Sequence, residues 1–292
     1  MKPGEASRTA EVVAIQRAAH QFLDRPVVFE DPLALQVLSA EAQAILRTDP
    51  GQTERSPVSK LLRAGLAVRS RVAEDTLADA VTRGVRQYVI LGAGFDTFAY
   101  RSPFQDVRVF EVDHPSTQAV KRQRLEAGSI AIPSSVTFVP FDFGGIASAD
   151  AATRGGPLAD ALASGGFDAA QPAVAAWLGV TMYLTPEEVR DTLRFVGSFS
   201  PGSTVVFDFY LPVEAVGFVT RIFYTRVLQR LEKLGEPWRA FYTPDAIRRE
   251  LQQAGFAQIE TLDRDALNGR YLANRPDHLD IGSLLHIAVA TT

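Results

Sequence analysis

Two glycines and an acidic side chain directly follow an apolar run in the sequence. Residues 88–91 read Tyr-Val-Ile-Leu, and Gly92, Ala93, Gly94 and Asp96 come next. An apolar run of this length predicts a strand covered on both faces, and a glycine after it lets the backbone turn without a Cβ clash. Open α/β sheets bind ligands in the crevice outside the carboxyl ends of their strands. The stretch therefore predicts a nucleotide-like ligand resting on the backbone of this loop.

The same loop lacks the two common phosphate-binding motifs. A dinucleotide fingerprint needs a third glycine where this chain has Thr97, and no Gly-x-x-x-x-Gly-Lys segment occurs. Pro103 should also cut short the helix that begins after the loop. The pattern suits a ligand without a pyrophosphate, such as S-adenosylmethionine. A tight turn that binds nothing is the alternative for the two glycines alone.

A second acidic residue, Asp113, ends the next alternating run. It stands about twenty residues beyond the glycines, where an acidic side chain accepts hydrogen bonds from ribose hydroxyls. Alternatively Asp113 caps the helix that Pro115 opens, and the two roles are compatible. A third strand at 136–140 ends before Asp142 and Phe143. We expect an adenine amino group and ring nitrogen to meet a carboxylate and a backbone N–H there.

Composition excludes several classes of function. The 292 residues are 46% hydrophobic with a formal net charge of −4, which gives no electrostatic reason to bind nucleic acid. There is no cysteine, which excludes disulfides and thiolate chemistry and fits a reducing cytoplasm. The four histidines lack metal-ligand spacing, so we expect no metal site. No apolar run reaches membrane-spanning length and no signal-peptide core is present, so we expect a cytoplasmic protein off the membrane. Nothing in the sequence defines an oligomeric state.

The elements that must position these residues alternate along most of the chain. Residues 1–82 should form a helical cap that belongs to the same domain as a core at 83–292. Strands alternate with helices through the core, which predicts a mostly parallel, doubly wound sheet. An amphipathic insertion at about 210–240 is either a lid or a helix that simply covers the sheet. The expected strands are residues 88–91, 107–112, 136–140, 172–178, 204–209, 256–262 and 284–290.

Two features of the cap bear on the site. Asp31 followed by Pro32 is a typical helix start. A long helix is expected at 57–82, and it carries Arg69 and Arg71. Arginines on such a helix are more often solvated than functional, so the residues alone do not make this pair a site.

Together the motifs resemble the leucine carboxyl methyltransferase family, including its bacterial members. Residues 9–14 and 17–20 are most similar to the branch that esterifies polyketide acids, the tetracenomycin-type carboxyl methyltransferases. The resemblance covers nearly the whole chain and is carried by residues 29–34, 91–97, 100–101, 111–115, 140–142, 177–184 and 235–239.

The resemblance implies a class I methyltransferase, Rossmann-like fold, in which the last strand is an antiparallel edge strand. It implies S-adenosyl-L-methionine as cofactor, with S-adenosyl-L-homocysteine as its product. Arg69 matches the family arginine that faces the cofactor and substrate carboxylates, and Tyr183 matches the tyrosine that helps hold the acceptor carboxylate. Packing against a helix is the alternative for Tyr183. The implied cofactor-binding residues are Arg69, Gly92, Ala93, Gly94, Asp96, Asp113, His114, Asp142, Phe143 and Leu178.

The segment at 177–184 discriminates among methyl acceptors. It lacks the (Asp/Asn/Ser)-Pro-Pro-(Tyr/Phe) loop used on base amines and the acidic pair needed for guanidinium groups. Leu178 stands where many relatives carry a glutamate near the methionine end of the cofactor. That difference suggests, as one alternative, a protein that binds the cofactor without transferring a methyl group.

Methyl transfer is a displacement at a sulfonium carbon, and an ionised carboxylate is already a nucleophile at neutral pH. Such an enzyme needs no general base and acts by aligning the reactants and excluding water. We therefore predict a carboxyl O-methyltransferase whose substrate is a small, polyketide-like carboxylic acid. A phenol or alcohol acceptor is the other alternative, and it needs a base that the sequence does not identify.

Overall fold

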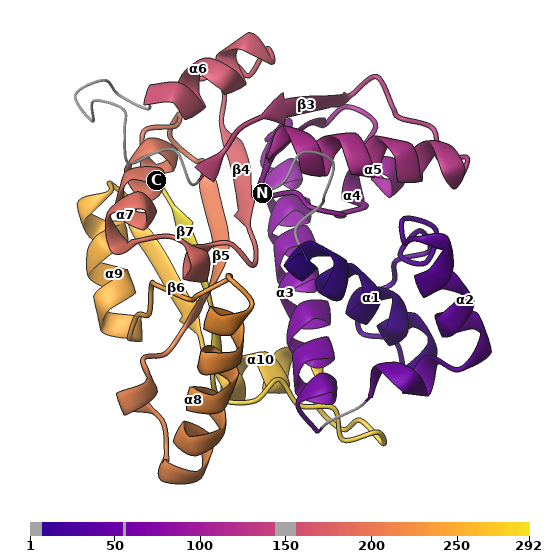
Figure 1. Ribbon diagram of the computed structural model, residues 1–292. Coiled ribbons are helices and arrows are strands. Elements are labelled where there is room, and N and C mark those ends of the chain that lie inside the picture. The colour runs from indigo at the N-terminus through magenta and orange to yellow at the C-terminus, as the bar shows by residue number, and fades with distance from the viewer. Residues whose placement is uncertain (1–7, 55–56, 144–155) are drawn as a thin grey trace.

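A seven-stranded sheet forms the centre of the computed structural model, which describes residues 8–54, 57–143 and 156–292 (Figure 1). The strand order is β3-β2-β1-β4-β5-β7-β6, and only β7 runs antiparallel to its neighbours. The predicted fold class is confirmed. The strands are β1 Gln87–Leu91, β2 Arg108–Asp113, β3 Val136–Pro140, β4 Ala173–Trp177, β5 Thr204–Tyr210, β6 Gln258–Leu262 and β7 Leu285–Thr291.

The antiparallel strand is not at the edge, and the expectation on this point was wrong. β7 lies between β5 and β6, so β6 is the edge strand. The side chains explain the order, because β7 is buried along most of its length whereas Gln258 and Glu260 of β6 are exposed. A half-polar strand suits an edge, and an apolar strand suits a position between two others.

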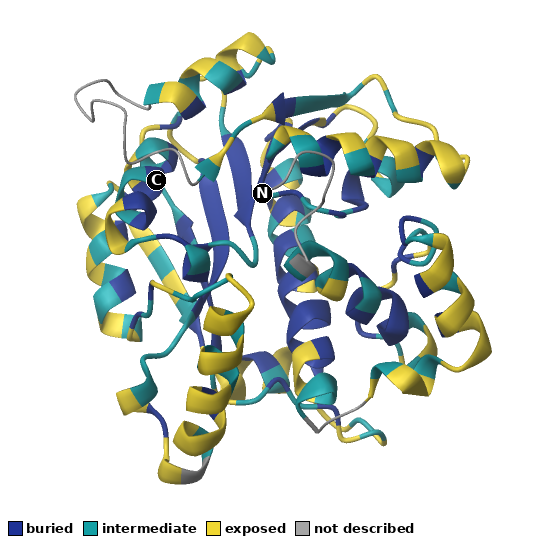
Figure 2. Ribbon diagram, viewed as in Figure 1, coloured by how far each residue is buried: buried dark blue, intermediate teal, exposed yellow. Residues whose placement is uncertain are grey.

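Helices cover both faces of the sheet, and strand side chains alternate between them. Tyr88 and Ile90 of β1 face one layer, made by α3 Pro57–Thr82, α4 Phe98–Arg101 and α10 Arg264–Tyr271. Val89 and Leu91 face the other layer. That layer contains α6 Gly156–Ser164, α7 Pro186–Gly197 and α9 Pro244–Gln253. Figure 2 shows the resulting buried strands between partly exposed helices.

The N-terminal helices pack as a separate cluster beside one end of the sheet (Figure 1). They meet Phe95 and Leu125 there. Their bounds are α1 Arg8–Leu23, α2 Ala40–Thr48 and the 3₁₀ helix η1 Pro50–Thr53, and Leu125 belongs to α5 Pro115–Ala127.

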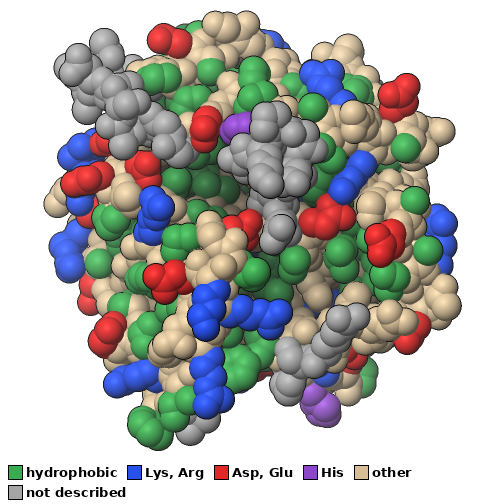
Figure 3. Space-filling view, in the orientation of Figure 1, with side chains coloured by type: hydrophobic (Ala, Val, Ile, Leu, Met, Phe, Trp, Pro, Cys, Tyr) green, Lys and Arg blue, Asp and Glu red, His purple; other side chains and the backbone are tan. Residues whose placement is uncertain are grey.

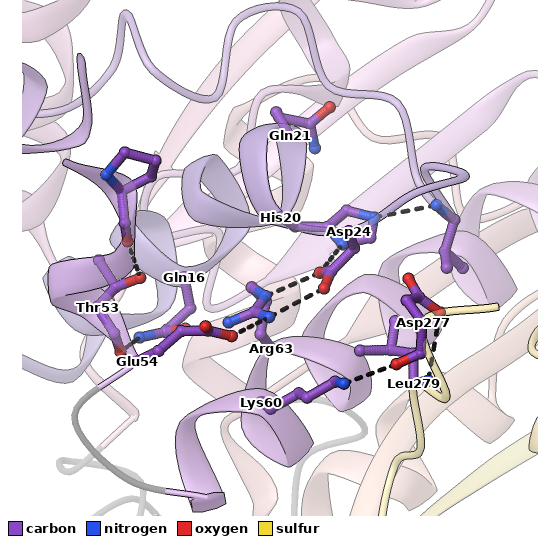
Figure 4. A network of polar contacts seen from close by, with 12 residues as sticks. Gln16, His20, Gln21, Asp24, Thr53, Glu54, Lys60, Arg63, Asp277 and Leu279 are labelled. Atoms are coloured by element: carbon purple, nitrogen blue, oxygen red, sulfur yellow. Dashed lines mark hydrogen bonds and ion pairs between the residues drawn. The ribbon is translucent and has the colours of Figure 1, made fainter. Parts of the chain in front are cut away.

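A buried ion-pair network joins α1 to α3 (Figure 4). Asp24 accepts hydrogen bonds at 2.8 and 2.9 Å from Arg63. His20 Nδ1 lies 2.7 Å from Asp24, while its Nε2 accepts from the backbone N–H groups of Val28 and Phe29, so Nδ1 carries the proton. Burial alone would raise the pKa of Asp24, but its bonds to Arg63 and His20 lower that pKa to about 2.

The expected helix start at Asp31 was wrong. Residues 32–38 form successive turns, although the Asp31 side chain does accept from the backbone N–H of Leu33. Its other oxygen is buried against Arg17 and Thr97. A tertiary ion pair thus uses the side chain that the local pattern assigned to a cap.

The connection after β5 carries the 3₁₀ helix η4 Val213–Ala215 and then α8 Phe218–Lys233. Tyr224 is buried and its hydroxyl donates to Leu211, whereas Phe218 is 75% exposed. The chain that follows α8 returns to the sheet, because the backbone N–H of Tyr242 donates to Tyr210.

Candidate functional site

A cavity of about 220 Å³ lies where β1, β2 and β4 end, and α1 forms one of its walls. His114 and Asp142 are outside its lining. Figure 3 shows apolar side chains in the hollows of this face and Lys and Arg side chains gathered over α8. The lining includes nine of the eleven residues selected from the sequence, namely Arg69, Gly92, Ala93, Gly94, Asp96, Asp113, Phe143, Leu178 and Tyr183.

The turn after β1 requires glycine at its first position. Gly92 has φ +72°, and a Cβ there would lie 2.3 Å from Val180 Cγ2. Gly94 has φ +48°, and a Cβ there would meet only Ala10, at 3.6 Å. The backbone at Gly94 therefore faces the open cavity. A cofactor that lies on the main chain fits this loop.

Asp113 holds the same turn from the neighbouring strand. Its carboxylate accepts from the backbone N–H of Gly94 at 2.5 Å and from that of His114 at 2.6 Å. Burial raises the pKa of Asp113 above its ordinary value, and these two bonds oppose the rise. The alternative that Asp113 caps α5 was wrong, since the N-cap is His114, whose side chain accepts from Ser116. His114 thus has a structural role outside the cavity.

Asp96 is part of a buried network rather than a free carboxylate. One oxygen accepts from the backbone N–H of Phe98, and the other is 3.3 Å from Arg17. Arg17 also donates to Asp31 at 2.5 Å and to Thr97 at 2.9 Å. Burial would raise the pKa of Asp31, but Arg17 and Arg101 keep it below its ordinary value. Arg17, which anchors α1 to the glycine loop, was not selected from the sequence as a site residue.

Arg69 reaches the cavity from α3 and pairs there with Asp208 of β5. Its Nη1 donates to the Asp208 carboxylate at 2.8 Å, and both side chains are buried. Among the described residues, Arg69 Nη2 has no hydrogen-bond partner. Leu178, in the next wall, packs against the apolar layer beside α3. Asp208 was not selected from the sequence either. An aspartate inside the apolar run of β5 is nevertheless a signal, because such residues are rarely buried unless paired.

Tyr183 also lines the cavity, and it belongs to the 3₁₀ helix η3 Thr181–Tyr183. Burial raises the pKa of its hydroxyl. Its ring meets Trp238 edge-on, with centroids 6.4 Å apart, and the adjoining backbone N–H of Arg239 donates to Met182. The chain after α8 therefore packs directly on η3.

Glu236 lies in this same stretch and was not selected from the sequence. The hydroxyl of Thr9, which lines the cavity, donates to its carboxylate. The first turn of α1 and the chain after α8 thus meet beside the cavity, 227 residues apart in sequence.

The described residues contain neither a membrane-spanning helix nor a metal cluster. No helix is both long and apolar enough to cross a bilayer. Within the same ranges, no cluster of three or more His, Asp or Glu side chains is arranged to hold a metal ion.

Comparison with known proteins agrees with this geometry. A family model described as Leucine carboxyl methyltransferase matches residues 10–197. The chain is 30% identical over 310 residues to YktD of Bacillus subtilis, provisionally named an S-adenosyl-L-methionine-dependent methyltransferase, with 98% of each chain covered. A similarly named protein of Mycobacterium tuberculosis, Rv3787c, is 35% identical over 217 residues, which are 70% of this chain and 66% of that relative.

Among solved structures, a DUF574 family protein from Streptomyces avermitilis shares the fold, with a TM-score of 0.54, 16% identity and 99% and 98% of the two chains covered. The chain belongs to the leucine carboxyl methyltransferase family and is an S-adenosyl-L-methionine-dependent methyltransferase.

Proposed function

We propose that the protein methylates a carboxylate of a small, polyketide-like natural product and so forms a methyl ester. The proposal is carried by Arg69 Nη2, which has no hydrogen-bond partner among the described residues and lies in the wall of a cavity that Tyr183 also lines. A planar guanidinium with free N–H groups suits a carboxylate, which accepts two hydrogen bonds in one plane. A tyrosine hydroxyl supplies one more donor.

The cofactor is proposed to lie along the glycine turn. The backbone of Gly92–Gly94 faces the open cavity at Gly94, and the Asp113 carboxylate has lone pairs left for ribose hydroxyls. Phe143 lines the cavity where an adenine ring is expected. Asp142 lies outside the lining, so its proposed contact with the adenine amino group is at the rim. When bound, the cofactor supplies a methyl group on a positively charged sulfur.

The residues of this chain then have two tasks. Arg69 and Tyr183 orient one acceptor oxygen toward the methyl carbon, and the apolar wall at Leu178 and Val180 excludes water. No proton has to be removed, because a carboxylic acid is ionised well below neutral pH. We therefore expect the rate of methyl transfer to rise with pH only as the acceptor ionises near pH 4, and then to stay level to about pH 8.

The test compares Arg69→Lys with Arg71→Lys. Lysine keeps the charge but loses the planar fork, so we expect turnover in Arg69→Lys to fall at least about tenfold, the equivalent of one lost hydrogen bond to a charged group. Arg71 lies on the same helix but is exposed and pairs with Asp75, so Arg71→Lys should keep full activity. The product of the wild-type enzyme should release methanol in mild alkali. A base-stable product made at full rate by Arg69→Lys would contradict the carboxylate proposal.

One observation favours a hydroxyl acceptor as a second candidate. Glu236 brings a carboxylate to the Thr9 hydroxyl beside the cavity, and a carboxylate in that place is a candidate general base for a phenol or alcohol. This candidate predicts a methyl ether that survives mild alkali, a rate that still rises above pH 7, and loss of activity in Glu236→Gln. If neither class of acceptor leads to release of S-adenosylhomocysteine, that result would instead support the alternative that the protein binds the cofactor without transferring a methyl group.

A further inference from the structure

Asp208 is buried directly behind the wall of the cavity and makes three hydrogen bonds there. One carboxylate oxygen accepts from Arg69 Nη1 at 2.8 Å, and the other accepts from the backbone N–H of Gly179 at 2.5 Å. Its own backbone carbonyl accepts from the Thr181 hydroxyl at 2.6 Å. Asp208 itself is absent from the cavity lining and has no exposed surface. Asp208 therefore links its own strand, β5, to α3 and to the segment that follows β4, without itself reaching a bound molecule.

The guanidinium of Arg69 lies tightly against Gly179. Gly179 has φ +73°, and a Cβ there would lie 2.6 Å from Arg69 Nη2 and 3.0 Å from Nη1. Leu178 and Val180, on either side of this glycine, both line the cavity. The Asp208 carboxylate thus fixes two parts of the wall together, the arginine and the segment at 178–180.

Only an ionised carboxylate satisfies both partners. Its two oxygens accept from two donors at once and balance the buried positive charge of Arg69. An asparagine has the same shape, but its NH₂ group would face one of the two donors. With asparagine at this position the buried positive charge of Arg69 would also lose its partner, at a large cost in free energy.

We propose that Asp208 is a positioning residue: it holds the Arg69 guanidinium and the segment at 178–180 in the geometry that binds the cofactor. The inference rests on the proposed function and deepens it, taking the role of Arg69 that the family resemblance implies, a guanidinium that faces the cofactor carboxylate as well as that of the acceptor. It does not depend on which acceptor is methylated, because Asp208 acts on the wall of the cofactor cavity.

The first experiment measures binding of S-adenosylhomocysteine by calorimetry to Asp208→Asn, with folding checked by circular dichroism. We expect the dissociation constant to rise about 10- to 100-fold, the range for losing the alignment of one charged group. Asp75→Asn is the matched control, since Asp75 forms an exposed pair with Arg71 on the same helix, and its affinity should stay within about twofold. Unchanged affinity in folded Asp208→Asn overturns the proposal.

A second variant tests the same geometry without touching the charge and serves if Asp208→Asn does not fold. Gly179→Ala pushes on the Arg69 guanidinium from the other side, and we expect a similar loss of affinity. Gly202→Ala is its control, because Gly202 also has a positive φ, +86°, but a Cβ there has no neighbour within 4 Å. Equal affinities in these two variants would contradict the proposal.

A third comparison separates positioning from stability. Arg69→Gln combined with Asp208→Asn removes both buried charges, so we expect its melting temperature to exceed that of either single variant. Its affinity for S-adenosylhomocysteine should nevertheless stay as weak as that of Arg69→Gln alone. Recovery of binding together with stability would show that Asp208 only supports the fold. All three readouts omit the acceptor, so a hydroxyl acceptor would refute the proposed function and leave this inference standing.

Discussion

Replacing Asp113 by asparagine tests the centre of the cofactor site. The carboxylate holds the backbone N–H groups of Gly94 and His114, and in the proposed complex it also accepts from the ribose. An amide has only one accepting oxygen for these donors. A hydrogen bond to a charged group is worth about 1.5–3 kcal/mol, so its loss should weaken cofactor binding roughly 10- to 150-fold.

The assay is calorimetric titration of the variant with S-adenosylhomocysteine, beside Asp106→Asn as a control. Asp106 pairs with Arg86 on the surface just before β2, at the other end from Asp113, and its replacement should leave affinity unchanged within about twofold. NADH should not bind either protein, because the loop lacks the third glycine.

The pH dependence gives an independent check on Asp113. Burial raises the pKa of its carboxyl, so protonation sets in at a higher pH than for an ordinary aspartate. Since the ionised form is the one proposed to bind the ribose, affinity should be full well above this raised pKa and fall as the pH drops through it. The Asp113→Asn variant should lack that fall. A folded variant with wild-type affinity and the wild-type pH profile would refute the reasoning.

Two further substitutions have outcomes that the structure sets. Gly92→Ala places a Cβ 2.3 Å from Val180, so S-adenosylhomocysteine should no longer raise the melting temperature, whereas Gly84→Ala, with similar backbone strain and no neighbour within 4 Å, should keep that shift. Asp24→Asn leaves the buried Arg63 with only Glu54, which is partly exposed, as its ionised partner, and this should lower the free energy of unfolding by up to about 3–5 kcal/mol in urea titrations. Because the pKa of Asp24 is depressed to about 2 from an ordinary value of 3.8, the wild-type stabilisation is present above about pH 4 and is lost as the pH falls toward 2, a loss that the variant should not show.

The fold was predictable because its signals are local. The long helix has the expected bounds, Pro57–Thr82, and each of the seven strands lies within two residues of its expected position. Apolar periodicity and the glycine and proline positions that punctuate it are read over a few residues at a time. The glycine turn was found for the same reason, since Gly92, Gly94 and Asp96 lie in one short stretch.

The contacts that complete the site join segments far apart in the chain. Arg17 reaches Asp96 across 79 residues, and Arg69 reaches Asp208 across 139. No local pattern reports which buried charge will pair with which. Asp31 shows the converse error, because a correct local signal for a helix start was overridden by an ion pair with Arg17.

The wall that α1 contributes to the cavity has a consequence for the exchange of cofactor and product. The middle of the helix is held by the buried Arg17–Asp31 pair, and breaking such a pair costs roughly 3–5 kcal/mol. Only about one protein molecule in 10²–10⁴ would then be in a conformation in which the whole helix is displaced from the cavity. Fraying of the first turn, at Thr9 and Ala10, breaks no buried ion pair among the described residues. Cofactor and product are therefore expected to enter and leave past the first turn of α1. The dissociation rate of S-adenosylhomocysteine should report on how often that turn opens.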